Sequence, residues 1–221
     1  MSNSSENTLP ESLLDDAETS DVENEIIKPR SFIEKTIKLY TVKIAQLLSK
    51  YSWITPNRIS VFSALLGGPL AGWLIWENNY FIAVAVIIIS GICDDLDGDL
   101  ARERGVASSE GAILDSVLDR YVDFFILSAL ILIDPIKHLI PGLLAMFGAM
   151  LVPYIRARSE AEGKSVVAAA IGNRTARIIM IILGILTQQF FPLLIVLAVT
   201  SNIAALQRLI FALKPQIKID G

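Results

Sequence analysis

The sequence is poor in the residues that build disulfides and zinc sites. It has one cysteine, Cys93, and one histidine, His138, among 221 residues. A single cysteine excludes a disulfide within the chain and a cysteine-based zinc site. Charged residues make up only 19% of the chain, whereas 53% of the residues are hydrophobic and the mean hydropathy is +0.55. This balance is unlike that of an ordinary soluble domain and is typical of a small integral membrane protein.

Residues 1–29 lack aromatic side chains and hold eight of the 23 acidic residues, all of them before the first basic residue, Lys28. Such an acidic, Ser/Asn-rich segment buries too little apolar surface to fold alone, so a disordered tail is predicted. The tail also lacks a basic stretch followed by an apolar core. We therefore expect no secretory signal, and insertion directed by the first membrane helix.

Six apolar stretches follow, each near the roughly 20 residues that cross a bilayer. A basic, amphipathic juxtamembrane segment, residues 30–55, precedes them and is expected to lie in the membrane interface. At its end, Thr55 and Pro56 are suited to the N-cap and first position of a helix. We predict an all-α integral membrane fold in which residues 56–213 form one six-helix domain and 214–221 form a short tail. The predicted transmembrane helices are 56–76, 79–102, 111–133, 137–159, 173–190 and 191–213.

Lysine and arginine residues are distributed unequally between the two sides of this six-helix arrangement. The side that holds the N-terminus carries 18 of the 19 basic residues, and only Lys137 falls on the other side. Basic residues mark the cytoplasmic side of a membrane protein. The sequence therefore predicts an integral cell-membrane protein with both termini at the cytoplasmic face, together with the end of the second helix.

Aspartates gather at that end of the second predicted helix, in the stretch SGICDDLDGDLARERG of residues 90–105. Helical spacing places Asp94 and Asp97 on one face, within an arc of about 100° that also contains the small residues Gly98 and Ala101. An ionised carboxylate is costly to bury in lipid unless a cation compensates it. This face is therefore predicted to hold a ligand.

The third predicted helix repeats the arrangement, because Gly111, Asp115 and Asp119 lie within an arc of about 80°. Two facing helices would bring four carboxylates together, and these can all stay ionised only if cations neutralise them. Oxygen ligands select Mg²⁺, Mn²⁺ or Ca²⁺, and such ions often complete their coordination with phosphate oxygens. One or two hard cations and a phosphate-bearing substrate are implied. Arg102, one turn beyond the first two aspartates, suits that anion.

The residues from 94 to 119 spell D-x(2)-D-G-x(2)-A-R-x(8)-G-x(3)-D-x(3)-D. This pattern resembles the signature of the CDP-alcohol phosphotransferases, also called CDP-alcohol phosphatidyltransferases. The resemblance implies a six-helix membrane enzyme, usually a homodimer, that acts in phospholipid biosynthesis. Such an enzyme uses Mg²⁺ or Mn²⁺, commonly two ions per site. It transfers a phosphoalcohol from a CDP-linked lipid donor to the hydroxyl of a small polar alcohol and releases CMP.

The resemblance also implies roles for single residues. Asp119 becomes the candidate catalytic base, and three further aspartates outside the motif, Asp95, Asp99 and Asp123, are expected to support the site or to be solvated. The implied metal ligands are Asp94, Asp97, Asp115 and Asp119. The implied residues for binding the CDP group are Gly98, Ala101, Arg102 and Gly111.

The acceptor is suggested by sequences outside the motif. DSVLDR at 115–120 differs from the DPxxDK form associated with glycerol phosphate acceptors in this family. VPYIRARSEAEG at 152–163 and IGNRTAR at 171–177 resemble the branch that makes phosphatidylinositol phosphate or archaetidylinositol phosphate. Pro153 departs from the serine of related bacterial enzymes, so one hydroxyl contact to the acceptor is expected to be missing. The predicted acceptor-phosphate residues are Arg156, Arg174, Arg177 and Arg208.

Several alternatives stay open from the sequence. The basic residues near the acceptor site would also be explained, without any ligand, by the general enrichment of lysine and arginine in cytoplasmic segments of membrane proteins. Glycerol phosphate, serine or free inositol could be the acceptor, and the donor could carry diacylglycerol or an ether-linked archaeal lipid. A divalent-cation transporter would need acidic residues along a route to both faces, whereas the outer connections offer only Glu77 and Asp134. Nucleic-acid binding has no support, because the basic residues follow the membrane topology.

Overall fold

The computed structural model describes residues 32–164 and 174–213. The predicted tail 1–29 and the C-terminal segment 214–221 lie outside these residues. The described parts consist of helices joined by short connections and contain no strand, which confirms the all-α prediction. The chain divides into two compact units between Tyr40 and Thr41, and all helices from α3 onward lie in the second. The elements are α2 (Phe32–Leu48), α3 (Pro56–Leu65), η1 (Leu66–Leu70), α4 (Ala71–Trp76), α5 (Tyr80–Glu103), α6 (Ser109–Ile133), α7 (Pro135–Ala161), α8 (Arg174–Thr187) and α9 (Phe190–Leu213).

The first predicted transmembrane helix is the continuous run of α3, η1 and α4. It begins at Pro56 with Thr55 as N-cap, as predicted. Its middle is a π-helical turn, η1, which contains Pro69. Proline has no N–H to donate to the preceding turn, so a local departure from α-helical hydrogen bonding is expected around it. The sequence analysis did not anticipate this irregular turn.

The first helix and α5 approach each other closely at two buried serines. The hydroxyl of Ser63 donates to the backbone carbonyl oxygen of Ser90 at 2.9 Å, and the hydroxyl of Ser90 donates to the backbone carbonyl oxygen of Ser63 at the same distance. A Cβ atom at Gly67 would collide with the Ser90 side chain. Small residues that allow such close approach are typical of helix contacts in membranes. The two serines and the glycine therefore fix α5 against the first helix.

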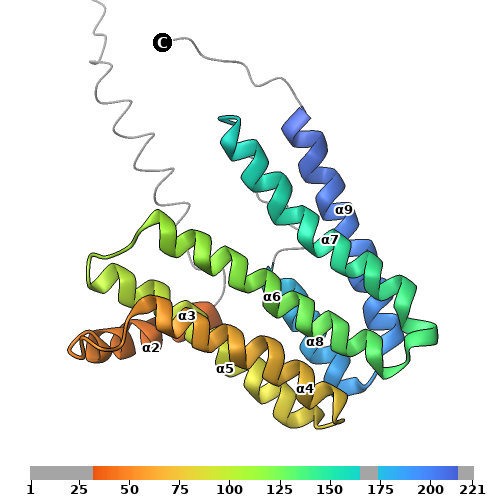
Figure 1. The fold of residues 1–221 in the computed structure, drawn as a ribbon, viewed down its shortest axis with the longest axis horizontal. Helices are drawn as coiled ribbons and strands as arrows, with labels where there is room; N and C mark the ends of the chain where they lie inside the picture. The colour runs from red at the N-terminus through yellow and green to blue at the C-terminus, as the bar shows by residue number, and fades with distance from the viewer. Residues whose placement is uncertain (1–31, 165–173, 214–221) are drawn as a thin grey trace, which may run out of the picture. The chain divides into compact units, whose positions relative to one another are not determined.

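Within the unit that begins at Thr41, α5 and α6 both pack on the first helix, and α7 lies along α9 (Figure 1). The α8 helix contacts α5 and α9. The outer faces carry many exposed apolar side chains, including Phe81 at 79% exposure and Ile136 at 97%. Extended apolar surface of this kind suits contact with lipid or with another protein. The largest apolar side chains that are fully buried between the helices are Ile75, Leu100, Ile126, Leu127, Leu130, Ile181, Ile185, Leu194 and Leu197.

Among the described residues, three helices are long and apolar enough to cross a membrane: Pro56–Trp76, Pro135–Ala161 and Phe190–Leu213. The prediction named six. The α5 and α6 helices are long enough, with 24 and 25 residues, but they carry the aspartates. The α8 helix has 14 residues, fewer than the predicted 173–190. The helices and three candidate spans support an integral membrane protein, and the count of six stays a prediction.

The connection between α2 and α3 is held by one arginine at the end of α5. The Arg104 guanidinium donates to four backbone carbonyl oxygens at 2.6–3.2 Å. Backbone carbonyl oxygens at and beyond the end of a helix depend on donors from outside the helix. Arg104 thus fixes the start of α3 beside the end of α5, where the predicted site residues lie. The four acceptors are the carbonyls of Leu48, Ser49, Tyr51 and Ile54.

Candidate active site

Three of the predicted metal ligands converge between α5 and α6. Asp94 and Asp97 extend from α5 and Asp115 from α6, and one oxygen of each lies within 4.8 Å of the others. Asp97 is 7% exposed, and its buried Oδ2 has no hydrogen-bond partner among the described residues. An orphaned carboxylate oxygen within an all-oxygen cluster is what a hard divalent cation would complete. The residues present therefore fit such an ion.

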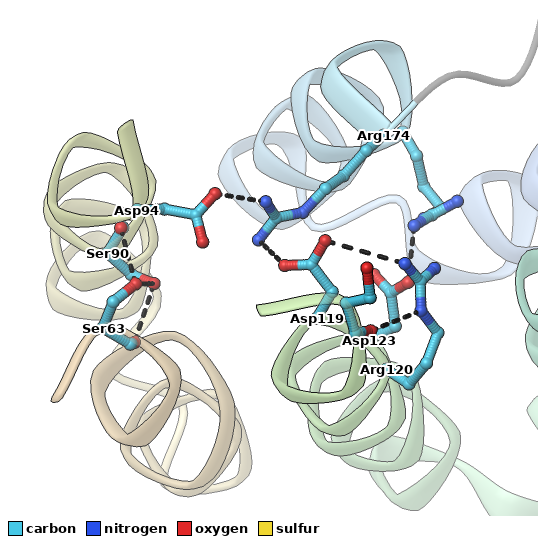
Figure 2. Close-up of polar contacts among 9 residues, drawn as sticks. Ser63, Ser90, Asp94, Asp119, Arg120, Asp123 and Arg174 are labelled. Atoms are coloured by element: carbon cyan, nitrogen blue, oxygen red, sulfur yellow. Dashed lines mark hydrogen bonds and ion pairs between the residues drawn. The ribbon is translucent and has the colours of Figure 1, made fainter. Parts of the chain in front are cut away.

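Asp119, the fourth predicted ligand, has different partners. Its Oδ1 lies 2.6 Å from Nη2 of Arg174, and its Oδ2 lies 3.6 Å from Nη2 of Arg120. Arg174 also forms an ion pair with Asp94, so its guanidinium reaches from α8 to aspartates on both α5 and α6 (Figure 2). Arginine suits such a bridge because its donors lie in a fixed planar fork. Asp119 is thus joined to the cluster through Arg174, and it is not among the three residues whose oxygens converge.

A cavity of about 550 Å³ opens beside the carboxylates. Its walls come from the start of α3, the end of α5, the α5–α6 connection and the start of α6, and they include Asp97 and Asp115. This size is within the range of small-molecule sites, about 300–1,000 Å³. All four residues predicted to bind the CDP group line it, namely Gly98, Ala101, Arg102 and Gly111.

Polar residues from the start of α3 and the α5–α6 connection also line the cavity, and the sequence analysis did not name them. Asn57 and Ser60 occupy the first two turns of α3, and Ser108 caps α6 by accepting from the Gly111 N–H at 3.2 Å. Hydrogen bonds from its own N–H and from the Ser108 hydroxyl hold the pKa of neighbouring Glu110 below its usual value. Polar side chains within an apolar predicted span were the signal that could have identified Asn57 and Ser60.

Arg102 lies along the cavity wall and is held by a neighbour on its own helix. Its Nη2 lies 2.7 Å from Oδ1 of Asp99, and its side chain is 61% exposed while that of Asp99 is 3% exposed. A Cβ atom at Gly98 would lie 3.3 Å from the same Nη2. The guanidinium therefore folds over Gly98, and the absence of a side chain at Gly98 leaves room for it.

The predicted acceptor arginines lie in three different settings. Arg174 contacts the aspartates, as described above. Arg156 on α7 pairs with Glu160 at 2.7 Å and is 62% exposed, whereas Arg208 on α9 is buried and donates to the carbonyl of Val152 at 3.1 Å. The Nε of Arg208 is buried without a hydrogen-bond partner among the described residues. Among the described residues, Arg174 is thus the only one of the predicted acceptor arginines that forms an ion pair with the motif aspartates.

Arg177 has a buried partner of its own. Its Nη2 lies 2.5 Å from Oδ2 of Asp123, and both side chains are almost completely buried. Asp123 and Asp99 were expected to support the site or to be solvated, and the structure buries both in ion pairs with arginines. The Nε of Arg177 is buried without a hydrogen-bond partner among the described residues.

The helices and the site together describe a membrane enzyme in which a carboxylate cluster adjoins a nucleotide-sized cavity. The CDP-alcohol phosphatidyltransferase family matches residues 53–211 of the chain. The chain therefore belongs to this family, as the motif predicted. It is accordingly a CDP-alcohol phosphotransferase, a membrane-associated transferase of phospholipid biosynthesis.

Curated relatives indicate the branch of the family. The chain is 30% identical to archaetidylinositol phosphate synthase of Pyrococcus horikoshii over 83% of this chain and 96% of that protein. It is 34% identical to the protein of the same name from Methanothermobacter thermautotrophicus over 72% of this chain and 80% of that protein. A bifunctional IPC transferase and DIPP synthase of Aquifex aeolicus is 33% identical, but the match covers only 40% of that protein.

Solved structures of one relative share the fold. Phosphatidylinositol phosphate synthase of Mycobacterium tuberculosis with CDP-DAG bound matches with a TM-score of 0.72 and 26% identity, over 82% of this chain and 97% of that one. The same enzyme in complex with manganese and citrate matches with a TM-score of 0.71, over 82% and 92% of the two chains. These similarities support the predicted inositol-phosphate branch.

Proposed function

We propose that this enzyme transfers a phosphatidyl or archaetidyl group from a CDP-linked lipid to a hydroxyl of inositol phosphate and releases CMP. The observation that carries this proposal is the cluster of Asp94, Asp97 and Asp115 at the wall of a nucleotide-sized cavity, with Arg174 held on Asp94. The names of the archaeal and mycobacterial relatives support inositol phosphate as the acceptor.

The proposed cofactor is Mg²⁺ or Mn²⁺. Asp94, Asp97 and Asp115 would hold one ion, and Asp119 would contribute to a second. The orphaned oxygen of Asp97 and the manganese complex of the mycobacterial relative support this assignment. The chemistry that a bound divalent ion supplies is polarisation of the donor diphosphate and stabilisation of the charge on the departing CMP.

The donor would bind with its CDP group in the cavity. Gly98, Ala101 and Gly111 have little or no side chain, so the nucleotide could approach the backbone of both helices. Arg102 would donate to the donor phosphates, for which a guanidinium is well suited. Its exposure and its position along the cavity wall support this role.

Asp119 is the proposed base. It would take the proton from the attacking acceptor hydroxyl as that oxygen forms a bond to the phosphorus attached to the lipid. The bond from this phosphorus to the CMP oxygen would break, and CMP would leave with the electron pair. The acceptor phosphate would bind Arg174, with Arg156 and Arg208 as further donors from α7 and α9. Arg177 stays a weaker candidate because of its pairing with Asp123.

We propose the following arrangement in the cell membrane. Residues 56–213 form six transmembrane helices, the juxtamembrane segment 30–55 lies in the interface, and the segments 1–29 and 214–221 extend into the cytoplasm. Within α2, Ile44 and Leu47 are exposed beside Lys43, which suits an interfacial helix. The active site faces the cytoplasm, and two copies of the chain form a homodimer, as the family resemblance implies.

The proposal is tested with purified protein in detergent, Mn²⁺ or Mg²⁺, and a panel of acceptors. The donors are CDP-diacylglycerol and its ether-linked archaeal counterpart, and the acceptors are inositol 1-phosphate, free inositol, glycerol 3-phosphate and serine. We expect CMP and a lipid product whose mass equals the lipid phosphate joined to inositol phosphate. A product with another acceptor, and none with inositol phosphate, would refute the acceptor assignment.

A further inference from the structure

Asp99 is a buried carboxylate that the family motif does not include. It is 4% exposed, and both of its oxygens accept hydrogen bonds. Oδ2 accepts from the Thr41 hydroxyl at 2.6 Å, and Oδ1 accepts from Nη2 of Arg102 at 2.7 Å. A buried charge is tolerated only where such partners compensate its loss of water. Asp99 is thus held between α2 and the cavity wall.

Arg102 gains a defined position from this contact. A free arginine side chain samples many rotamers, and fixing it in one of them costs conformational entropy. The contact with Asp99 folds the guanidinium over Gly98, at the wall of the cavity where the donor phosphates are proposed to lie. Because Arg102 would already be ordered before the donor binds, donor binding would cost less conformational entropy and would be tighter.

Thr41 fixes the carboxylate in turn. Its side chain is 1% exposed, and its hydroxyl comes from the part of α2 that belongs to the same unit as the site. The end of α2 is held independently by Arg104, which donates to the carbonyl of Leu48. The position of the Thr41 hydroxyl is therefore determined by the fold, and it orients Asp99 toward Arg102.

We propose that Asp99 is a positioning residue of the donor site, which fixes the Arg102 guanidinium for the phosphates of the CDP-linked lipid and is itself oriented by Thr41. This inference rests on the proposed role of Arg102 in donor binding. It adds a hydrogen-bonded chain from α2 through Thr41 and Asp99 to Arg102.

The test is a double-mutant cycle on the KM for the CDP-lipid donor. The variants are Asp99→Asn, which keeps the shape and removes the charge, Thr41→Val, Arg102→Gln and the double variant of Asp99 and Arg102. We expect Asp99→Asn to raise the donor KM about five- to tenfold, because Arg102 would lose its fixed position but keep its charge, and Thr41→Val to raise it less. The acceptor KM should stay unchanged. In the Arg102→Gln background, Asp99→Asn should raise the donor KM no further.

Glu162→Gln is the control, because Glu162 forms an exposed ion pair with Arg158 away from the cavity. It should leave the donor KM unchanged. If Asp99→Asn raises the donor KM equally with and without Arg102, or leaves it unchanged, the positioning role is refuted. Should Asp99→Asn fail to fold, Thr41→Val and its combination with Arg102→Gln complete the same cycle. Absence of CMP release by the unmodified enzyme would instead refute the proposed function.

Discussion

Arg177 of α8 and Asp123 of α6 form an ion pair in which Nη2 lies 2.5 Å from Oδ2 and the side chains are only 4% and 5% exposed. One turn earlier on the same two helices, Arg174 pairs with Asp119 at 2.6 Å (Figure 2). Two parallel ion pairs therefore join α6 to α8. The first is buried away from the cavity, and the second lies beside the carboxylate cluster.

Removing one partner of the buried pair should destabilise the protein. Asp123→Asn leaves Arg177 as an uncompensated buried charge, for which a loss of about 3–5 kcal/mol is expected. Thermal unfolding in detergent measures it as a lower Tm. The matched control is Glu162→Gln, which removes the partner of exposed Arg158 and should cost about 0–1 kcal/mol. Equal Tm values for the two variants would contradict the structural role of Asp123.

Metal binding should depend on the converging aspartates. Asp97→Asn removes a charged ligand and should weaken Mn²⁺ binding by at least about tenfold, since changes even outside the direct ligands commonly cost that much. The measurement is electron paramagnetic resonance of free Mn²⁺ during a titration, which does not depend on activity. Asp134→Asn, in the exposed pair with Lys137 at the start of α7, is the control and should bind Mn²⁺ normally. Unchanged affinity in Asp97→Asn would exclude the cluster as the metal site.

Variants of two arginines on α7 can distinguish a role in acceptor binding from the general preference for basic residues at the cytoplasmic face. Arg156 pairs with Glu160 and Arg158 with Glu162, both four residues apart, and the two arginine side chains are 62% and 64% exposed. The four-residue spacing places each arginine one helical turn from its glutamate, where such ion pairs form. Arg156→Gln should raise the KM for inositol 1-phosphate about tenfold, while Arg158→Gln should leave it within about twofold. Equal changes in this KM for the two variants would contradict a specific role of Arg156 in acceptor binding.

The orientation in the membrane can be tested by labelling single cysteines. In a Cys93→Ser background, Val106→Cys lies in the α5–α6 connection and Glu77→Cys follows α4. Both positions are exposed. A membrane-impermeant maleimide applied to intact spheroplasts should label Glu77→Cys, and should label Val106→Cys only after lysis. The reverse pattern would contradict the predicted cytoplasmic site.

The motif residues could be predicted from the sequence because helical spacing alone sets which side chains share a face. Asp94 and Asp97 face Asp115 across two helices, as that spacing implies. The grouping of Gly98, Ala101, Arg102 and Gly111 came from the family resemblance, and all four line one cavity. The helix boundaries predicted from the apolar stretches agree with the observed ones to within a few residues. The start of α3 at Pro56 was predicted correctly because the residue types at a helix start have defined preferences.

Contacts between distant segments could not be predicted in this way. The sequence offered no reason to place Arg174 between Asp94 and Asp119, which are 80 and 55 positions away from it. Nor did it distinguish buried Asp99 and Asp123 from solvated acids, since their partners Thr41 and Arg177 come from other helices. The cavity wall formed by Asn57 and Ser60 depends on how α3 packs against α5, which local spacing does not encode.

The central claim is tested most directly by CMP release from the unmodified enzyme compared with Asp119→Asn. The reaction contains CDP-lipid donor, Mn²⁺ and either inositol 1-phosphate or free inositol, and thermal unfolding verifies that the variant folds. We predict release with inositol 1-phosphate at a rate at least about 100-fold higher than in Asp119→Asn, as loss of a general base commonly produces. Release should be far slower with free inositol. Equal release by the two proteins, or release with free inositol alone, would contradict the account.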